Sequence, residues 1–132
     1  MERFGARIAE QLRAGDAVAL SGTLGTGKTT LARAIIAALG HQGEVPSPTF
    51  TIIETYDPPS VRLPLVHADF YRLKHPDEAQ EIGLDDYRQG AVMIAEWPEM
   101  AGGFAHEPGC LSIALETAEM GRIAIVEPGA DW

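Results

Sequence analysis

The chain has 132 residues, which predicts one domain, and its hydrophobic content of 45% is enough for one buried core. Its formal net charge of −9, from 19 acidic and 10 basic residues, argues against a protein that binds nucleic acid through a broad basic surface. No segment has the length of a transmembrane helix, and the N-terminus lacks the apolar stretch of a signal peptide. The one cysteine, Cys110, favours a reducing compartment, so we expect a cytoplasmic protein that binds a small ligand or a basic partner.

The N-terminal third predicts a helix, a strand and a second helix. Residues 1–14 carry apolar side chains four positions apart on one face, the pattern of an amphipathic helix. Residues 17–21 form a short apolar run, which is typical of a strand buried on both faces. A helix-period run then spans about Lys28 to Leu39 and is followed by Gly40, a residue that commonly ends helices.

The stretch from Gly22 to Thr30 joins that strand to the second helix and matches the phosphate-loop pattern G-x-x-x-x-G-K-[ST]. Its glycines let backbone N–H groups surround phosphate oxygens, and the helix that follows adds the positive end of its dipole. Lys28 would reach the outer phosphates and the Thr29 hydroxyl would bind Mg²⁺. A glycine-rich turn without a ligand would not require the lysine and threonines. The predicted nucleotide contacts in this loop are Leu24, Gly25, Thr26, Gly27, Lys28, Thr29 and Thr30.

The middle of the chain predicts an antiparallel ribbon followed by short helices. Residues 50–56 are rich in β-branched and aromatic side chains, and residues 61–68 read as the returning strand. Short helices are predicted over 76–82, where Pro76 suits a first helical turn, and over 84–89.

The C-terminal part predicts a buried strand and a hairpin. Residues 91–96 form the second strongly apolar strand, a natural parallel neighbour of 17–21. Strands over 111–115 and 122–126 are joined by a short turn, and the tail 127–132 reads as irregular. The fold class that follows is α/β: a small single-domain P-loop NTPase fold, with a mixed sheet and central parallel strands.

Two acidic residues are candidates for the metal that a phosphate loop requires. Mg²⁺ is usually held by one or two carboxylates or hydroxyls together with phosphate oxygens. Glu96 ends the apolar strand 91–95, and Asp69 ends the segment 65–68. Each could instead cap a turn or face water. We therefore predict one of these acids at the metal, with Glu96 the stronger candidate.

Hydrolysis of the γ-phosphate needs charge neutralisation and an oriented water. The charge would be neutralised by Lys28, the loop N–H groups and Mg²⁺. Asp69 or Glu96 could orient or deprotonate the water. Thr49 lies where switch segments of P-loop hydrolases place a hydroxyl that senses the γ-phosphate. A threonine that simply precedes a strand is an equal alternative.

Four further residues could belong to the site or serve only the fold. Trp97 could stack on a base or contact a partner, or it could be a half-buried aromatic at a strand end. Arg122 could reach phosphates or stack on adenine, or it could be an exposed hairpin arginine. His67 and His75 are not spaced with other ligand types as a metal site, and we interpret both as structural or solvated.

Five blocks, in order and spacing, resemble those of the bacterial tRNA threonylcarbamoyladenosine biosynthesis ATPases, the TsaE (YjeE) family. The resemblance covers nearly the whole chain, and it departs from the usual family pattern at Thr23, Pro46 and Ala68. Taken with the phosphate loop, the His-x-Asp-x-Tyr-Arg-Leu and Glu-Trp-Pro blocks are far more specific than the loop alone. The blocks are 22–33, 47–51, 67–73, 81–87 and 96–98.

This resemblance implies a weak ATPase that uses ATP and Mg²⁺ and works with two partner proteins of the sugar-kinase-like class. One partner transfers a threonylcarbamoyl group to the adenosine beside the anticodon of tRNAs reading ANN codons, and the ATPase supports turnover. It also implies that Thr29 and Glu96 bind magnesium, that Asp69 is required for hydrolysis and that Arg122 contacts the nucleotide. With a net charge of −9, we expect contact with tRNA only through the partners.

Two other functions remain open from the sequence: a small nucleoside or nucleotide kinase, and a nucleotide-sensing module that does not hydrolyse. A kinase usually carries a lid with arginines that close on the phosphates. Few arginines follow the second helix, and no lid-like insertion is visible.

Overall fold

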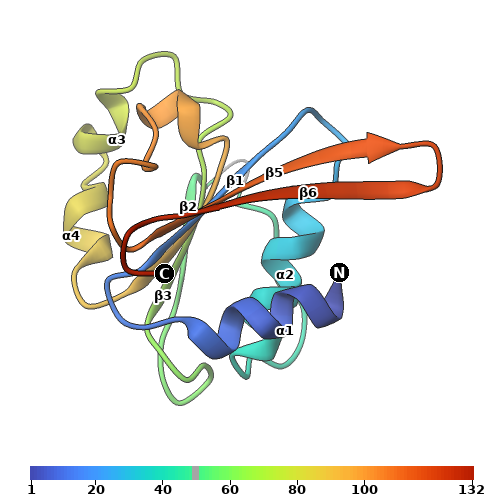
Figure 1. Ribbon diagram of the computed structural model, residues 1–132. Coiled ribbons are helices and arrows are strands. Elements are labelled where there is room, and N and C mark those ends of the chain that lie inside the picture. The colour runs from blue at the N-terminus through green and yellow to red at the C-terminus, as the bar shows by residue number, and fades with distance from the viewer. Residues whose placement is uncertain (49–50) are drawn as a thin grey trace.

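The computed structural model describes residues 1–48 and 51–132, and its strands form a single twisted sheet (Figure 1). Across the sheet the strand order is β2-β3-β4-β1-β5-β6. The strands are β1 (Ala17–Ser21), β2 (Ile53–Tyr56), β3 (Leu65–Asp69), β4 (Val92–Glu96), β5 (Cys110–Ala118) and β6 (Gly121–Pro128).

The centre of the sheet is parallel and its two edges are antiparallel. Strand β1 pairs in parallel with both β4 and β5, and β3 pairs in parallel with β4. Strand β2 runs antiparallel to β3, and β6 runs antiparallel to β5. The predicted mixed sheet, with 17–21 beside 91–96 at its centre, is therefore confirmed. Because β1, β3 and β4 are parallel, their carboxyl ends meet at one edge of the sheet.

Helices cover both faces of the sheet (Figure 1). One face is packed by α1 (Glu2–Gln11) and α2 (Lys28–Ala38). The other carries α3 (Glu78–Glu81), α4 (Leu84–Arg88) and the 3-10 helix η1 (Pro98–Ala101). Among the described residues, no helix is long and apolar enough to cross a membrane.

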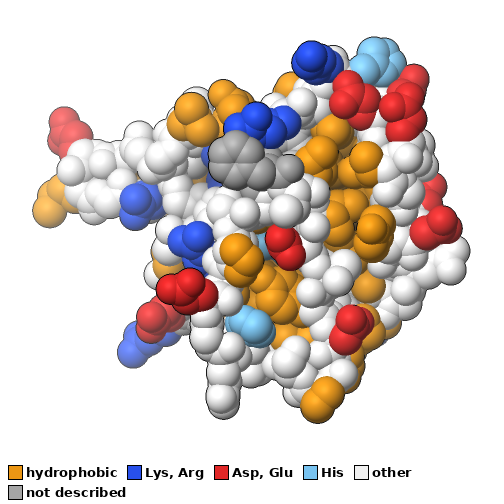
Figure 2. Space-filling model, turned by 180° about the vertical axis from the view of Figure 1, so that it is seen from behind, with side chains coloured by type: hydrophobic (Ala, Val, Ile, Leu, Met, Phe, Trp, Pro, Cys, Tyr) orange, Lys and Arg blue, Asp and Glu red, His pale blue; other side chains and the backbone are white. Residues whose placement is uncertain are grey.

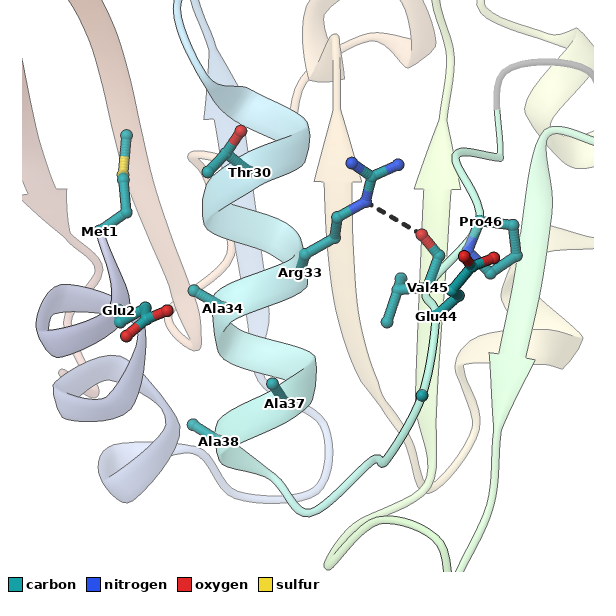
Figure 3. Close-up of a pocket in the computed structure, with 11 residues that line it drawn as sticks. Met1, Glu2, Thr30, Arg33, Ala34, Ala37, Ala38, Glu44, Val45 and Pro46 are labelled. Atoms are coloured by element: carbon teal, nitrogen blue, oxygen red, sulfur yellow. Dashed lines mark hydrogen bonds between the residues drawn. The ribbon is translucent and has the colours of Figure 1, made fainter.

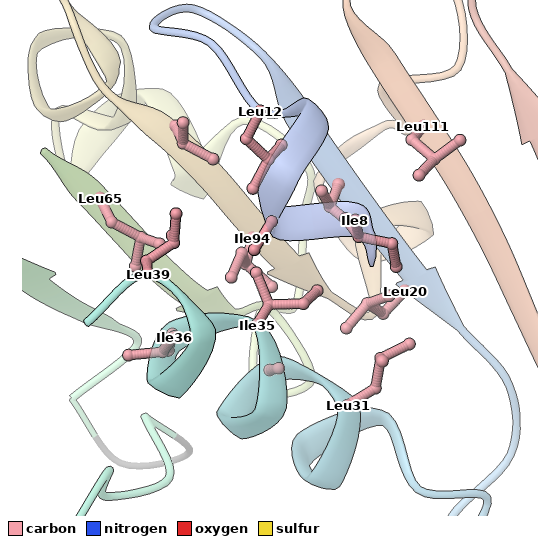
Figure 4. Close-up of a cluster of buried hydrophobic side chains, with 14 of the residues drawn as sticks. Ile8, Leu12, Leu20, Leu31, Ile35, Ile36, Leu39, Leu65, Ile94 and Leu111 are labelled. Atoms are coloured by element: carbon pink, nitrogen blue, oxygen red, sulfur yellow. The ribbon is translucent and has the colours of Figure 1, made fainter. Parts of the chain in front are cut away.

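The larger hydrophobic cluster lies between the sheet and the pair α1 and α2. Alternate residues of β1 and β4 point into it, and the remaining ones point into a second cluster beneath α3 and α4. Both strands are thus buried on both faces, which explains their uninterrupted apolar runs. Figure 4 labels these members of the larger cluster: Ile8, Leu12, Leu20, Leu31, Ile35, Ile36, Leu39, Leu65, Ile94 and Leu111.

The strand that returns to the sheet begins later than the sequence pattern predicted. It was expected over 61–68, whereas β3 starts at Leu65. The backbone N–H of Arg62 donates to the carbonyl of Leu39 after α2, at 2.8 Å, and Pro64 has no N–H to offer. Arg62 therefore connects the end of α2 to the sheet, and Pro64 pairs only through its carbonyl, which accepts from the Val92 N–H at 2.9 Å.

Boundaries of α1, β2 and β6 also differ from the prediction, and α1 ends at Gln11 rather than at residue 14, because Leu12 is already extended. Strand β2 was expected over 50–56, of which residue 50 lies outside the described residues, and it starts at Ile53 because Ile52 has a left-handed backbone (φ 69°) that interrupts the extended run. The tail predicted as irregular is partly ordered, since β6 continues to Pro128, which pairs with Leu111. The antiparallel hairpin was predicted correctly, but its strands are longer than expected.

Candidate functional site

The loop between β1 and α2 depends on glycine at defined positions. Gly22 and Gly27 have left-handed backbones, with φ of 137° and 100°. A Cβ added at Gly22 would lie 2.5 Å from the carbonyl oxygen of Leu115 in β5 and 2.8 Å from the Thr26 hydroxyl. The close approach of β5 therefore excludes a side chain at Gly22, and the loop curls over the carboxyl end of β1.

Lys28, the first residue of α2, is buried inside this loop. Its Nζ donates to the carbonyl oxygens of Gly22 (2.7 Å) and Thr23 (2.8 Å). Burial lowers the pKa of the Lys28 ammonium, and the nearby carboxylates of Glu96, Glu99 and Asp69 act in the opposite direction. The ammonium thus lies at the centre of the loop, where the outer phosphates of a nucleotide would come.

Thr29, Glu96 and His67 form a hydrogen-bonded chain next to the loop. The Thr29 hydroxyl donates to Glu96 Oε1 at 2.6 Å, and His67 Nε2 lies 2.6 Å from Glu96 Oε2. Glu96 is 2% exposed and His67 is fully buried. Both carboxylate oxygens of Glu96 therefore have a partner.

The sequence left open whether His67 is structural or solvated, and the structure shows that it is fully buried. Its contact with Glu96 was not predicted. A usable signal was present: His67 and Asp69 are two residues apart on one strand, so they point to the same face of the sheet. His75 is exposed, as expected, with Nδ1 3.4 Å from Asp77 Oδ2.

Asp69 lies beside Glu96 at the same edge of the sheet. The two residues are register partners at the ends of β3 and β4. Asp69 is 5% exposed, and its Oδ1 accepts a hydrogen bond from the backbone N–H of Tyr71 at 3.0 Å. The parallel pairing therefore brings together the two acids that the sequence predicted from separate strand ends.

A cavity of about 370 Å³ connects these groups. All of the predicted site residues that the structure describes line this cavity, except Thr26. The Thr26 hydroxyl instead donates to the carbonyl of Thr23 within the loop, at 2.8 Å. Thr49, the predicted sensor of the γ-phosphate, lies outside the described residues. The cavity is lined by Leu24, Gly25, Gly27, Lys28, Thr29, Thr30, Asp69, Tyr71, Glu96, Trp97 and Arg122.

Arg122 and two aromatic residues form the rim of this cavity. A Cβ built on Gly27 would lie 3.2 Å from Arg122 Nε, so this hairpin arginine lies against the phosphate loop. The rings of Tyr71 and Trp97 are 4.9 Å apart between centroids. Trp97 is half-buried, whereas Tyr71 is 45% exposed and was not assigned to the site from the sequence. The hairpin that carries Arg122 projects from the body of the molecule as a narrow arm (Figure 2).

A larger cavity, of about 880 Å³, lies elsewhere, between α2, residues 43–46 and the N-terminus (Figure 3). Its walls are mostly alanines of α2 and the loop held by the hydrogen bond from Arg33 Nε to the Val45 carbonyl at 3.0 Å. No lysine lines it, and its two carboxylates, Glu2 and Glu44, lie on opposite sides of α2 (Figure 3). We place the functional site in the smaller cavity, because its cationic, hydroxyl and carboxylate groups converge.

The donor set beside the loop fits a magnesium ion that arrives with a nucleotide. The described residues contain no group of three or more His, Cys, Asp or Glu side chains that could hold a metal alone. The Thr29 hydroxyl and the Glu96 carboxylate bring two oxygen atoms to the same spot, the atom type that Mg²⁺ prefers, and its other ligands would come from phosphates and water.

A phosphate loop after a central parallel strand, with a buried acid at the end of the neighbouring strand, defines this protein as a member of the P-loop NTPase class. The profile of the family described as "Threonylcarbamoyl adenosine biosynthesis protein TsaE" matches residues 1–124. The chain belongs to the TsaE family.

Individual relatives agree with this assignment. A Streptomyces coelicolor protein named "tRNA threonylcarbamoyladenosine biosynthesis protein TsaE" is 46% identical over 100 residues, covering 75% of this chain and 68% of that protein. A Haemophilus influenzae protein of the same name is 38% identical over 117 residues, covering 84% of this chain and 73% of that protein. The crystal structure of YdiB from Bacillus subtilis superimposes with a TM-score of 0.76 at 29% identity, covering 98% of this chain and 79% of that one.

Proposed function

We propose that this chain is an ATP-binding, weakly ATP-hydrolysing subunit required to form the threonylcarbamoyl group on the adenosine beside the anticodon of tRNAs reading ANN codons. The observation that carries the proposal is the convergence of Lys28, Thr29, Asp69 and Glu96 in one cavity at the carboxyl edge of the sheet. Membership of the TsaE family supplies the biosynthetic context.

The residues of the cavity have separate tasks in this proposal. The backbone N–H groups of the loop and the Lys28 ammonium bind the phosphates, while Arg122 contacts the nucleotide from the hairpin. Thr29 and Glu96 hold Mg²⁺, which neutralises charge on the phosphate oxygens when bound.

Asp69 is the proposed general base or water-orienting group. It is buried beside Glu96, and the N–H of Tyr71 fixes one of its oxygens. A carboxylate held in this way can orient a water for attack in line with the γ-phosphate. Slow hydrolysis by the isolated chain is expected, because the rate would rise only when a partner completes the site.

The proposed partners are two proteins of the sugar-kinase-like class, one of which performs the transfer to tRNA. The net charge of −9 supports an indirect relation to tRNA, since an acidic surface repels the phosphate backbone. Hydrolysis in this chain would serve turnover of the partner complex rather than the transfer chemistry.

The test is ATP hydrolysis measured with and without the two partner proteins. Lys28→Ala and Glu96→Ala should each lower partner-stimulated hydrolysis by about 100-fold, the scale at which lost transition-state charge stabilisation acts. Matched controls are Lys74→Ala and Glu10→Ala, at exposed positions outside the cavity, which should stay within about twofold of wild type.

Other results would replace the proposal. Full partner-stimulated hydrolysis in both site variants would exclude this mechanism. Nucleotide binding without hydrolysis, even with the partners present, would indicate a sensing module. Phosphate transfer to an added nucleoside would indicate a kinase.

A further inference from the structure

His67 lies in the middle of β3, beneath the site, and is fully buried. Its Nε2 is 2.6 Å from Glu96 Oε2, while its Nδ1 is buried without a hydrogen-bond partner in the part of the chain that the structure describes. A leucine of similar volume would fill this space without burying an unpaired nitrogen, which usually costs about 1–3 kcal/mol. The contact with Glu96 is thus the one polar interaction that the imidazole ring makes there.

The direction of this hydrogen bond follows from the chemistry of its two groups. An ionised carboxylate only accepts hydrogen bonds, so the proton between them is assigned to Nε2, which donates to Oε2. The other oxygen, Oε1, accepts from the Thr29 hydroxyl. The two oxygens of Glu96 therefore face different neighbours, one in the sheet interior and one at the cavity.

We propose that His67 is a positioning residue, which fixes Glu96 Oε2 so that Oε1 is presented to a magnesium ion beside Thr29. The inference rests on the proposed function in one respect, namely that Mg²⁺ enters with the nucleotide between Thr29 and Glu96. Groups that hydrogen-bond a metal ligand from behind restrict its orientation, and their loss typically weakens metal affinity by about 10–100-fold.

His67 is separate from the groups that bind phosphate directly. It does not line the cavity, and its hydrogen bond is to Glu96 rather than to the loop. Removing its donor should therefore weaken the contribution of Mg²⁺ to nucleotide binding and leave metal-free binding close to wild type. General damage to the fold would weaken both.

The experiment measures binding of a non-hydrolysable ATP analogue by calorimetry, in EDTA and over a series of Mg²⁺ concentrations. In His67→Leu the Mg²⁺ concentration for half-maximal enhancement should rise about 10–100-fold, with metal-free affinity within about twofold of wild type. In His67→Gln the terminal amide nitrogen can occupy the position of Nε2, and the effect should be at most a few-fold. In His67→Asn the shorter amide falls short of Glu96, so this variant should resemble His67→Leu.

The Gln and Asn pair keeps the test decisive if the leucine variant fails to fold, because both are polar and differ in reach. Leu65→Met, a buried change two residues away on the same face of β3, is the packing control and should bind like wild type. Equal Mg²⁺ dependence in wild type and all His67 variants would overturn the positioning role alone. Absence of any Mg²⁺ effect in the wild-type protein would instead overturn the proposed metal site itself.

Discussion

The ammonium group of Lys28 lies against the face of the Trp97 indole, with Nζ 4.3 Å from the ring centroid. Trp97 follows β4 directly and has a left-handed backbone, with φ of 56°, before Pro98 begins η1. This turn places the ring over the phosphate loop, although Trp97 and Lys28 are far apart in the sequence. A cation–π contact of this kind stabilises a charged lysine that is shielded from water.

Nucleotide binding should therefore change the fluorescence of Trp97. Lys28 Nζ would exchange loop carbonyls for phosphate oxygens, which alters the charge above the indole ring. The chain has two tryptophans, and the other, Trp132, donates from its indole N–H to the Gly109 carbonyl at 2.8 Å and lies outside the cavity. We expect Trp132→Phe to keep the fluorescence change on ATP addition and Trp97→Phe to abolish it. A signal that follows Trp132 instead would contradict the placement of Trp97.

Thr29 and Glu96 should control the Mg²⁺ requirement together. Thr29→Val removes the hydroxyl and Glu96→Gln removes the charge while keeping the shape, so each should raise the Mg²⁺ concentration for half-maximal hydrolysis by about 10–100-fold. Thr29→Ser retains the hydroxyl and is the matched control. A Mg²⁺ titration of partner-stimulated hydrolysis checks this, and a Thr29→Val enzyme with a normal Mg²⁺ requirement would remove Thr29 from the metal site.

Arg88 and Glu107 should make stability depend on acidic pH. Arg88 donates to Glu107 through Nη1 (2.9 Å to Oε2) and Nη2 (2.5 Å to Oε1), and these hydrogen bonds lower the pKa of the Glu107 carboxyl despite its partial burial. A lowered folded-state pKa stabilises the protein above the ordinary value of 4.5, and the effect is lost as pH falls through the folded pKa. Arg88→Gln should thus cost about 1 kcal/mol at pH 7.

Urea unfolding of wild type and Arg88→Gln at a series of pH values measures this difference. The difference in the free energy of unfolding should have its full value at pH 7 and should shrink as pH falls below 4.5. The double variant Arg88→Gln with Glu107→Gln is the control, because it removes both charges. A difference between wild type and Arg88→Gln that stays constant down to acid pH would show that Arg88 contributes through packing.

Gly5 should be intolerant of alanine although it lies inside a helix. Alanine usually stabilises a helix by about 1 kcal/mol relative to glycine. A Cβ at Gly5, however, would lie 2.7 Å from the Cβ of Ala34 in α2. Gly5→Ala should therefore destabilise the protein by about 1–3 kcal/mol, since α1 would have to move away from α2.

Thermal or urea unfolding of Gly5→Ala gives the sign of this effect. The exchange variant Gly5→Ala with Ala34→Gly removes the contact with the Ala34 Cβ but leaves the new Cβ 3.0 Å from the backbone carbon of Ala34 and the backbone nitrogen of Ile35. It should therefore recover only part of the stability that Gly5→Ala loses. A stabilised Gly5→Ala variant would mean that the two helices separate at little cost.

Elements with strong local patterns could be predicted from the sequence. The run 17–21 is apolar throughout because both of its faces are buried, and the glycines that follow match backbone angles that other residues rarely adopt. The phosphate loop, α2 and the acid at the end of β4 are all found where these patterns placed them. The late start of β3 could not be predicted, because a hydrogen bond from Arg62 to Leu39 diverts the chain there.

The sequence by itself determined the α/β fold class, the phosphate loop and the pair of candidate acids, because each depends on neighbours within a few residues. Only the tertiary structure decided which groups meet. Strand order brings Asp69 beside Glu96, and the β5–β6 hairpin carries Arg122 to the loop. The pairing of β3 with β4 also brings His67 to Oε2 of the Glu96 carboxylate. These contacts depend on strand pairing between distant segments, and spacing along one chain does not encode that pairing.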